Sequence, residues 1–256
     1  MISKHAIIDP QAKIAENVEI GPWTIIGPDV EIGENTWIGP HVVIQGPTKI
    51  GKNNKIFQFS SIGEAPQDKK FNGETTYLEI GDFNIIREFC TFNRGTEQGG
   101  SYTRVGNHNL FMAYVHIAHD CVVHDHTIFA NNASLAGHAI VQDHVTLGGF
   151  SGVNQFCTVG AHSFITKGTL VAKDIPPYFI IKGGIEAYPA AVNVIGMQRK
   201  GISENSIALI KKAFKIIYKR GFTVNDAIEQ LKQIQEVPEL ANLIQFLQVS
   251  QMGIIH

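Results

Sequence analysis

The sequence lacks three features that would assign it to a common class. It contains only three cysteines among 256 residues, an odd number that argues against a framework of disulfides. It has no run of about 20 apolar residues, the length needed to span a bilayer. The first residues, MISKHAIIDP, have no long apolar core followed by a small-residue cleavage site. We therefore expect a cytoplasmic protein without a transmembrane segment.

The sequence also lacks an excess of charge of either sign. It has 21 lysines and arginines against 23 aspartates and glutamates, a formal net charge of -2. Proteins that hold nucleic acid through its phosphates carry an excess of base, so we expect no nucleic-acid partner. The length allows one or two domains with a sizeable core.

Apolar residues recur at every sixth position along most of the chain. Glycine often follows them, as at Gly21 and Gly27, and small or β-branched residues recur two places before them, as at Val18 and Thr24. The repeated positions are Ile2, Ile8, Ile14, Ile20, Ile26, Ile32, Ile38, Ile44, Ile50, Ile56, Ile62, then Ile80, Ile86, Phe92, and after a slip Val105, Phe111, Ile117, Val123, Phe129, Leu135, Val141, Leu147, Val153, Val159, Ile165, Val171.

This period of six matches neither an amphipathic helix nor an alternating strand. It fits a short strand followed by a corner, and three units of six residues close a triangular coil of 18 residues. Stacked coils bury a continuous apolar core, as in other solenoids. The sequence therefore predicts a mainly β fold, a parallel β-helix, although the period does not reveal its hand.

Two polar segments interrupt the repeat, Gly63–Glu79 and Arg94–Arg104. Both are rich in turn-forming residues, so we expect them to loop out from the coils. Long loops on a rigid scaffold often carry function, although a plain insertion is the alternative.

The repeat stops near Pro176 and Pro177, and a helical pattern follows. Ser203 is placed to cap a helix that ends at Gly221, and Thr223 and Pro238 are placed to begin two more. We predict a small helical domain from about residue 187.

The 18-residue coil converts spacing into contact, because adjacent parallel strands lie about 4.8 Å apart. Gly137 should stack on His119 and His138 on Asp120, and Gln155 should continue the His119 column. Histidine suits general-base work because its pKa lies near working pH, and a glycine amide can serve as an oxyanion donor. The patch is therefore a candidate acyl-transfer site; the alternative is a set of inert histidines at a solenoid corner.

A second column has histidine at every eighteenth residue, and a basic stripe lies in the helical region. Zinc ligands must converge on one point, and four histidines stacked along one edge do not. We therefore expect these histidines to form a polar ladder. The spacing of His119 and His124 nevertheless resembles that of trimeric hexapeptide-repeat carbonic anhydrases. The basic stripe is either a solvated helix face or a dock for an acidic carrier protein. The ladder comprises His108, His126, His144 and His162, and the stripe comprises Lys211, Lys215 and Lys219.

Five segments, SIGEAPQDKKFNGE, HIAHDC, ANNASLAGH, NQFCTVGAH and DIPPY, together resemble the UDP-N-acetylglucosamine acyltransferase family of lipid A biosynthesis. The resemblance covers essentially the whole chain. It implies a left-handed parallel β-helix over residues 1–186, a C-terminal helical domain over residues 187–256, and a homotrimer whose clefts lie between neighbouring subunits.

The resemblance also implies a reaction, the transfer of a 3-hydroxyacyl group from acyl carrier protein to the glucosamine 3-hydroxyl of UDP-N-acetylglucosamine. It implies that His119 is the general base with Asp120 beside it, and that Gly137 supplies the oxyanion amide. No metal or dissociable cofactor is implied beyond the phosphopantetheine arm of the carrier. The substrate-binding positions that it implies are Gln67, Asp68, Lys70, His116, His138, Gln155, Asn193 and Arg199.

Three residues depart from the family pattern. Asn154 stands where a histidine is usual among the substrate-binding positions, and Ile195 stands where an acidic residue is usual. Lys167 stands where a glycine is usual at the wall of the acyl-chain pocket, and in relatives bulk at that wall shortens the accepted chain. Lys167 would cap the pocket if it points inward and leave it open if it reaches solvent.

The departures at Asn154 and Ile195 leave the acceptor open between the 3-hydroxyl and a 3-amino analogue of the sugar nucleotide. A neutral amine is the better nucleophile and needs less help from a base. A metal-dependent hydratase on the same solenoid and a non-catalytic scaffold are the alternatives outside acyl transfer.

Overall fold

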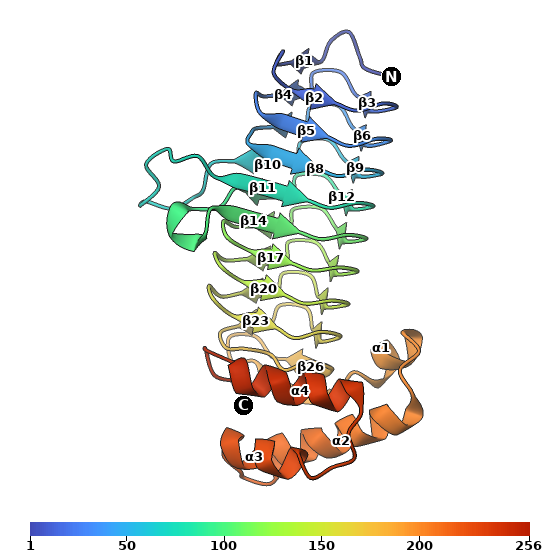
Figure 1. Cartoon of the computed structure of the whole chain (residues 1–256), viewed down its shortest axis with the longest axis vertical. Coiled ribbons are helices and arrows are strands. Elements are labelled where there is room, and N and C mark those ends of the chain that lie inside the picture. The colour runs from blue at the N-terminus through green and yellow to red at the C-terminus, as the bar shows by residue number, and fades with distance from the viewer.

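The protein is a left-handed parallel β-helix that ends in a group of α-helices, as the computed structural model of residues 1–256 shows. Its strands form three sheets of 9, 8 and 10 strands. From β1 to β25 each strand pairs with strands three places away along the chain, while β26 pairs with β24 and β27. In Figure 1 the strands nearest the viewer run from left to right while the coils descend from the N-terminus, which is a left-handed winding. The predicted fold class is confirmed.

The three sheets take the three strands of each coil in turn. Sheet 1 comprises β1 (Ile7–Ile8), β4 (Ile25–Ile26), β7 (Val43–Ile44), β10 (Ser61–Glu64), β13 (Thr91–Asn93), β16 (His116–Ile117), β19 (Ser134–Leu135), β22 (Gly152–Val153) and β25 (Leu170–Val171). Sheet 2 comprises β2 (Lys13–Ile14), β5 (Val30–Ile32), β8 (Thr48–Ile50), β11 (Tyr77–Ile80), β14 (Tyr102–Val105), β17 (Val122–Val123), β20 (Ile140–Val141) and β23 (Thr158–Val159). Sheet 3 comprises β3 (Glu19–Ile20), β6 (Trp37–Ile38), β9 (Lys55–Ile56), β12 (Ile85–Ile86), β15 (Leu110–Phe111), β18 (Ile128–Phe129), β21 (Thr146–Leu147), β24 (Phe164–Ile165), β26 (Phe179–Lys182) and β27 (Tyr188–Val192).

The core is the stack of apolar residues that the six-residue repeat predicts. Ile38, Ile86 and Leu147 are completely buried, and the repeated residues from Ile20 to Val171 all belong to one continuous cluster. Burial of a side chain of this size contributes about 1.5–3 kcal/mol, so the column of inner residues is the main stabilising feature of the solenoid.

Most strands are followed by a corner at which one residue has a positive φ, as at Asp120 (61°), His126 (59°) and His138 (63°). Asparagine, aspartate and histidine tolerate this left-handed conformation better than most residues. Rings at successive corners stack on one another, and stacking offsets part of the strain. In the histidine ladder, ring centroids are 4.9 Å apart from His108 to His126 and 4.9 Å apart from His126 to His144. The predicted ladder is therefore present as a column of stacked rings.

The two predicted interruptions lie at one corner of the β-helix, on the left in Figure 1. Both loops are shorter than the sequence predicts, because residues 63–64 and 77–79 of the first interruption and residues 102–104 of the second belong to strands. The first leaves 65–76 between β10 and β11, a segment called the first loop below. The second begins after β13 and contains the 3-10 helix η1 (Glu97–Gly99) before β14 begins at Tyr102.

Four helices follow β27: α1 (Val194–Arg199), α2 (Glu204–Lys219), α3 (Val224–Leu231) and α4 (Pro238–Val249). They cover the C-terminal end of the β-helix (Figure 1). Ser203 and Thr223 accept hydrogen bonds from the first turns of α2 and α3, as predicted, and Pro238 begins α4. None of the helices combines the length and apolar character needed to cross a membrane.

The helices begin seven residues later than the predicted boundary at residue 187 (194 − 187 = 7). The reason is β27, which pairs antiparallel with β26 and so extends sheet 3. The division into a β-helical domain and a helical domain remains a prediction.

Candidate active site

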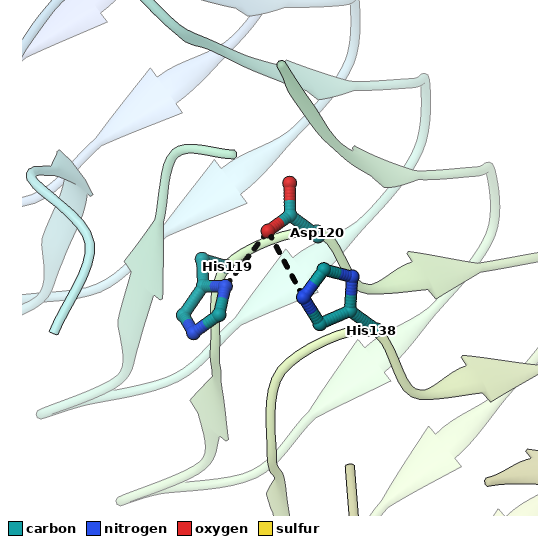
Figure 2. Close-up of side chains that lie close together, drawn as sticks. All are labelled: His119, Asp120 and His138. Carbon is teal, nitrogen blue, oxygen red and sulfur yellow. Dashed lines mark hydrogen bonds and ion pairs between the residues drawn. The ribbon is translucent and has the colours of Figure 1, made fainter. Parts of the chain in front are cut away.

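His119 and Asp120 form a hydrogen-bonded pair at the corner between β16 and β17. Nδ1 of His119 lies 2.7 Å from Oδ2 of Asp120, and Figure 2 shows the carboxylate between the rings of His119 and His138. The positive φ of Asp120 turns the chain at this point, which places neighbouring side chains on the same outer edge. An ionised carboxylate only accepts hydrogen bonds, so Nδ1 of His119 carries the proton and Nε2 is the basic nitrogen.

The Asp120 carboxylate is buried and accepts from three donors. Its side chain is 0% exposed, and besides His119 it accepts the Thr96 N–H at 2.7 Å and the Thr96 hydroxyl at 2.6 Å. Burial opposes ionisation, but hydrogen bonds from His119 and Thr96 outweigh it and hold the pKa of Asp120 below its usual range. The carboxylate is therefore charged at neutral pH and can stabilise a protonated His119.

Gly137 lies one coil after His119, as the 18-residue spacing predicts. A Cβ atom at this glycine would lie 2.5 Å from Cε1 of the His119 ring, so any side chain here would push the imidazole away. The Gly137 N–H donates no hydrogen bond within the chain. A backbone donor is thus available beside the basic nitrogen, which is the arrangement that an oxyanion requires.

His138 and His116 complete the histidine group at this corner. Nε2 of His138 lies 3.6 Å from Oδ2 of Asp120, and Nδ1 of His116 lies 2.7 Å from the Thr91 hydroxyl. Burial lowers the pKa of both rings. Both are therefore neutral at pH 7. Thr91 occupies Nδ1 of His116, so His116 can offer a polar ligand only its Nε2 atom.

The first loop approaches the same corner. Burial lowers the pKa of His138, and the negative charges of Asp120 and, less strongly, Asp68 oppose this effect, so Asp68 lies within electrostatic range of the ring. Gln67 and Lys70 are exposed on this loop. The substrate-binding roles of Gln67, Asp68 and Lys70 remain predictions.

Asn193 and Arg199 lie elsewhere on the single chain. Asn193 caps α1 and donates to the His162 carbonyl at 2.8 Å. With Arg199, His144 and His162 it lines a cavity of about 650 Å³, whose ladder histidines occupy the corner at the far end of the sheet 2 strands. One chain therefore does not bring Asn193 and Arg199 to His119.

The remaining predicted residues are accessible on the coils that follow His138. Asn154 and Gln155 are exposed, with Gln155 in the column of His119 and Gly137. Lys167 is also exposed, so on a single chain its side chain faces outward.

One group of residues has ligand atoms close enough to hold a metal ion. The atoms of His119, Asp120 and His138 lie within 4.8 Å of one another. However, Oδ2 of Asp120 already accepts from His119 and from the Thr96 hydroxyl. A carboxylate engaged in this way fits a hydrogen-bonded acid–base pair better than a zinc ligand, which must be free to coordinate.

Sequence reasoning missed two residues of this site, Thr96 and Gly99. Both belong to the second interruption, and a Cβ atom at Gly99 would lie 2.1 Å from Cγ of Asp120. The contacts of Thr96 and Gly99 with Asp120 do not follow the 18-residue spacing. The only feature of the sequence that marks these two residues is the interruption of the repeat in which they lie.

Comparison with known proteins identifies the family. Models of bacterial hexapeptide transferase repeats match residues 1–33, 29–63 and 102–137. A model described as UDP-N-acetylglucosamine O-acyltransferase, domain 2, matches residues 174–255. The acyl-[acyl-carrier-protein]–UDP-N-acetylglucosamine O-acyltransferase of Thiobacillus denitrificans is 56% identical over 251 residues, or 98% of this chain and 97% of the relative. The chain belongs to this acyltransferase family.

Solved structures of the acyltransferase family have the same fold over the whole chain. LpxA from Acinetobacter baumannii is 49% identical with a TM-score of 0.97, and the match covers 100% of this chain and 99% of that one. LpxA from Bacteroides fragilis, a UDP-N-acetylglucosamine acyltransferase, is 40% identical with a TM-score of 0.98, and covers 100% of both chains. The β-helix and the terminal helices thus form one arrangement throughout these acyltransferases.

Proposed function

We propose that the chain transfers a 3-hydroxyacyl group from acyl carrier protein to the 3-hydroxyl of UDP-N-acetylglucosamine, the first step of lipid A biosynthesis. The observation that carries this function is the His119–Asp120 pair beside the free Gly137 amide. It occurs in a chain that is similar over its full length to named O-acyltransferases.

The geometry supports a direct transfer. Nε2 of His119 takes the proton of the acceptor hydroxyl, while Nδ1–H donates to Asp120, whose charge stabilises the imidazolium. The acceptor oxygen bonds to the thioester carbonyl carbon, and the Gly137 N–H donates to the oxyanion that forms. The carbon–sulfur bond then breaks, and His119 returns the proton to the departing thiolate. This balance requires no cofactor beyond the phosphopantetheine arm of the carrier.

Substrate-binding roles follow from where the remaining polar residues lie. We propose that the residues near His119 contact the sugar nucleotide from one subunit, and that Asn193 and Arg199 reach it from a neighbour, since a single chain keeps them at another corner. This division supports a site shared between subunits, and we propose that they form the homotrimer that the family resemblance implies. The residues proposed for the first subunit are Gln67, Asp68, Lys70, His116, His138, Asn154 and Gln155. The cytoplasmic location remains a prediction.

The acceptor is tested by offering the purified protein 3-hydroxyacyl carrier protein with either UDP-N-acetylglucosamine or its 3-amino analogue. We expect transfer to the hydroxyl, because the complete His119–Asp120 pair provides the base catalysis that an alcohol needs and an amine largely does not. Product formation is followed by mass spectrometry. Transfer to the amine alone would contradict the proposal and make Asn154 and Ile195 markers of a changed acceptor.

The acyl-chain pocket is tested by Lys167→Gly. If the lysine stem shortens the pocket, the variant is expected to prefer longer chains, by up to about fourfold per additional methylene, the equivalent of about 0.8 kcal/mol of burial. The measurement is kcat/KM for a series of 3-hydroxyacyl carrier proteins. Lys173→Gly, at another exposed lysine, is the control. An unchanged preference in Lys167→Gly would show that the lysine does not cap the pocket.

A further inference from the structure

The segment from Asn93 to Gly99 links the first loop to the catalytic pair. At its start, the Asn93 side-chain amide donates to the Ala65 carbonyl at 2.8 Å, at the base of the first loop. The Arg94 guanidinium donates to the Gly63 carbonyl at 2.8 Å. The base of the first loop is therefore tied to a short stretch of chain that continues directly to Asp120.

Thr96, three residues further on, is buried against Asp120. It is 2% exposed, and its N–H and hydroxyl donate to the two different oxygens of the carboxylate, at 2.7 and 2.6 Å. The Thr96 oxygen in turn accepts the Gly99 N–H at 3.2 Å. A hydroxyl has one proton, and because Gly99 occupies an acceptor position, that proton is directed at Asp120.

Gly99 closes the segment over the carboxylate. A Cβ atom at this position would meet Cγ, Oδ1 and Oδ2 of Asp120 at 2.1–2.4 Å, so only glycine allows the 3-10 turn to lie this close. The second interruption of the repeat thus covers one side of the carboxylate, and His119 lies against Oδ2.

The contacts of Thr96 matter because Asp120 has a second possible partner. Nε2 of His138 lies 3.6 Å from the same oxygen that His119 contacts. A carboxylate held only by its own side-chain torsion could rotate toward His138 and leave the Nδ1 proton of His119 without an acceptor. The two Thr96 donors remove that freedom.

We propose that Thr96 is a positioning residue for acyl transfer, which holds the Asp120 carboxylate on Nδ1 of His119 while the same segment anchors the first loop. This inference rests on the proposed function, since it assigns Thr96 a part in the same reaction. Thr96 acts through Asp120 and His119 and does not itself contact the reacting atoms.

The test compares Thr96→Val, which removes the hydroxyl and keeps the shape, with Thr96→Ser, which keeps the donor. Thr96→Val is expected to lower kcat by about 10- to 100-fold, as expected for loss of a hydrogen bond to a charged group, with little change in KM. Thr96→Ser should stay near the wild-type value. The control is Thr24→Val, at another buried threonine whose hydroxyl donates to a carbonyl, that of Gly39, in a distant coil.

Two further measurements separate positioning from a general loss of structure. The pKa of the Asp120 carboxyl, followed by NMR of the carboxyl carbon, should be higher in Thr96→Val than in the wild type, because a carboxylate with fewer donors binds a proton more strongly. The ionisable groups that face Asp120 directly are His119 and His138, and Asp68 acts through His138. In NMR spectra, the Nδ1 proton of His119 should change its chemical shift in Thr96→Val and keep it in Thr24→Val.

The outcomes distinguish this inference from the function beneath it. If Thr96→Val keeps the wild-type kcat, Asp120 titration and His119 Nδ1 resonance, the positioning role is wrong although acyl transfer stands. If the wild-type protein transfers no acyl group, the proposed function is wrong, and the Nδ1 resonance still decides whether Thr96 holds the pair together. A Thr24→Val variant that loses as much kcat as Thr96→Val would also contradict a specific role.

Discussion

His119→Ala is expected to reduce kcat for acyl transfer by on the order of 10²- to 10⁴-fold, the contribution typical of general base catalysis. His119 donates a hydrogen bond to the Asp120 carboxylate through Nδ1, at 2.7 Å, and keeps Nε2 free, whereas His138 lies 3.6 Å from the same oxygen, beyond hydrogen-bond distance. Its loss removes both the proton acceptor for the hydroxyl and the proton donor for the leaving sulfur. The measurement is the steady-state rate with saturating UDP-N-acetylglucosamine and acyl carrier protein substrates.

His41→Ala is the matched control for this loss. His41 is an exposed corner histidine stacked between Trp23 and Phe59 in a coil far from the site. This variant should keep the wild-type rate, while both variants should remain folded by circular dichroism. A folded His119→Ala protein with wild-type turnover would remove His119 from the mechanism.

The sequence predicts the β-helix because each inner position imposes the same requirement. Ile38, Phe111 and Leu147 occupy equivalent slots with different shapes, and all three are completely buried. A slot that must be apolar in every coil leaves a periodic signal that does not depend on any long-range contact. The hand left no such signal, since the apolar period is the same for either winding.

The candidate site is predictable from sequence only where the coils are unbroken. His119 and Gly137, or Asp120 and His138, are one uninterrupted coil apart, so a spacing of 18 residues places them together. The interruptions change the spacing. Thr91 pairs with His116 across 25 residues, and Thr96 contacts Asp120 across 24. The 18-residue spacing, which predicts the contacts of Asp120 with its neighbours in the unbroken coils, therefore does not predict that Thr96 and Gly99 contact it.

The histidine ladder shows the limit of reading chemistry from residue type. His144 and His162 stack with ring centroids 4.7 Å apart, and burial lowers the pKa of His162 to about 4. At neutral pH this ring is uncharged, so it can stack against its neighbour without repulsion. Stacking of rings at left-handed corners accounts for the repeated histidines of the ladder without catalysis.

Phe111→Ala is expected to lower the free energy of unfolding by about 3–5 kcal/mol, the range for removing a buried phenylalanine. Phe111 is completely buried between Phe92 and Phe129, with ring centroids 4.9 and 5.0 Å away. Coils on both sides are held by their own hydrogen bonds and cannot collapse into the space. Urea unfolding monitored by circular dichroism measures the change.

Ile128→Ala provides the comparison, since Ile128 lies next to Phe129 on the same strand but points outward with 39% exposure. Ile128→Ala should lower the free energy of unfolding by well under half as much as Phe111→Ala. The Ile128 side chain contributes little buried apolar surface, and its removal leaves no internal cavity. Equal losses at the two positions would mean that the inner column is not the main source of stability. A larger loss at Phe111 would show that the residues which define the six-residue period are also those that hold the coils together.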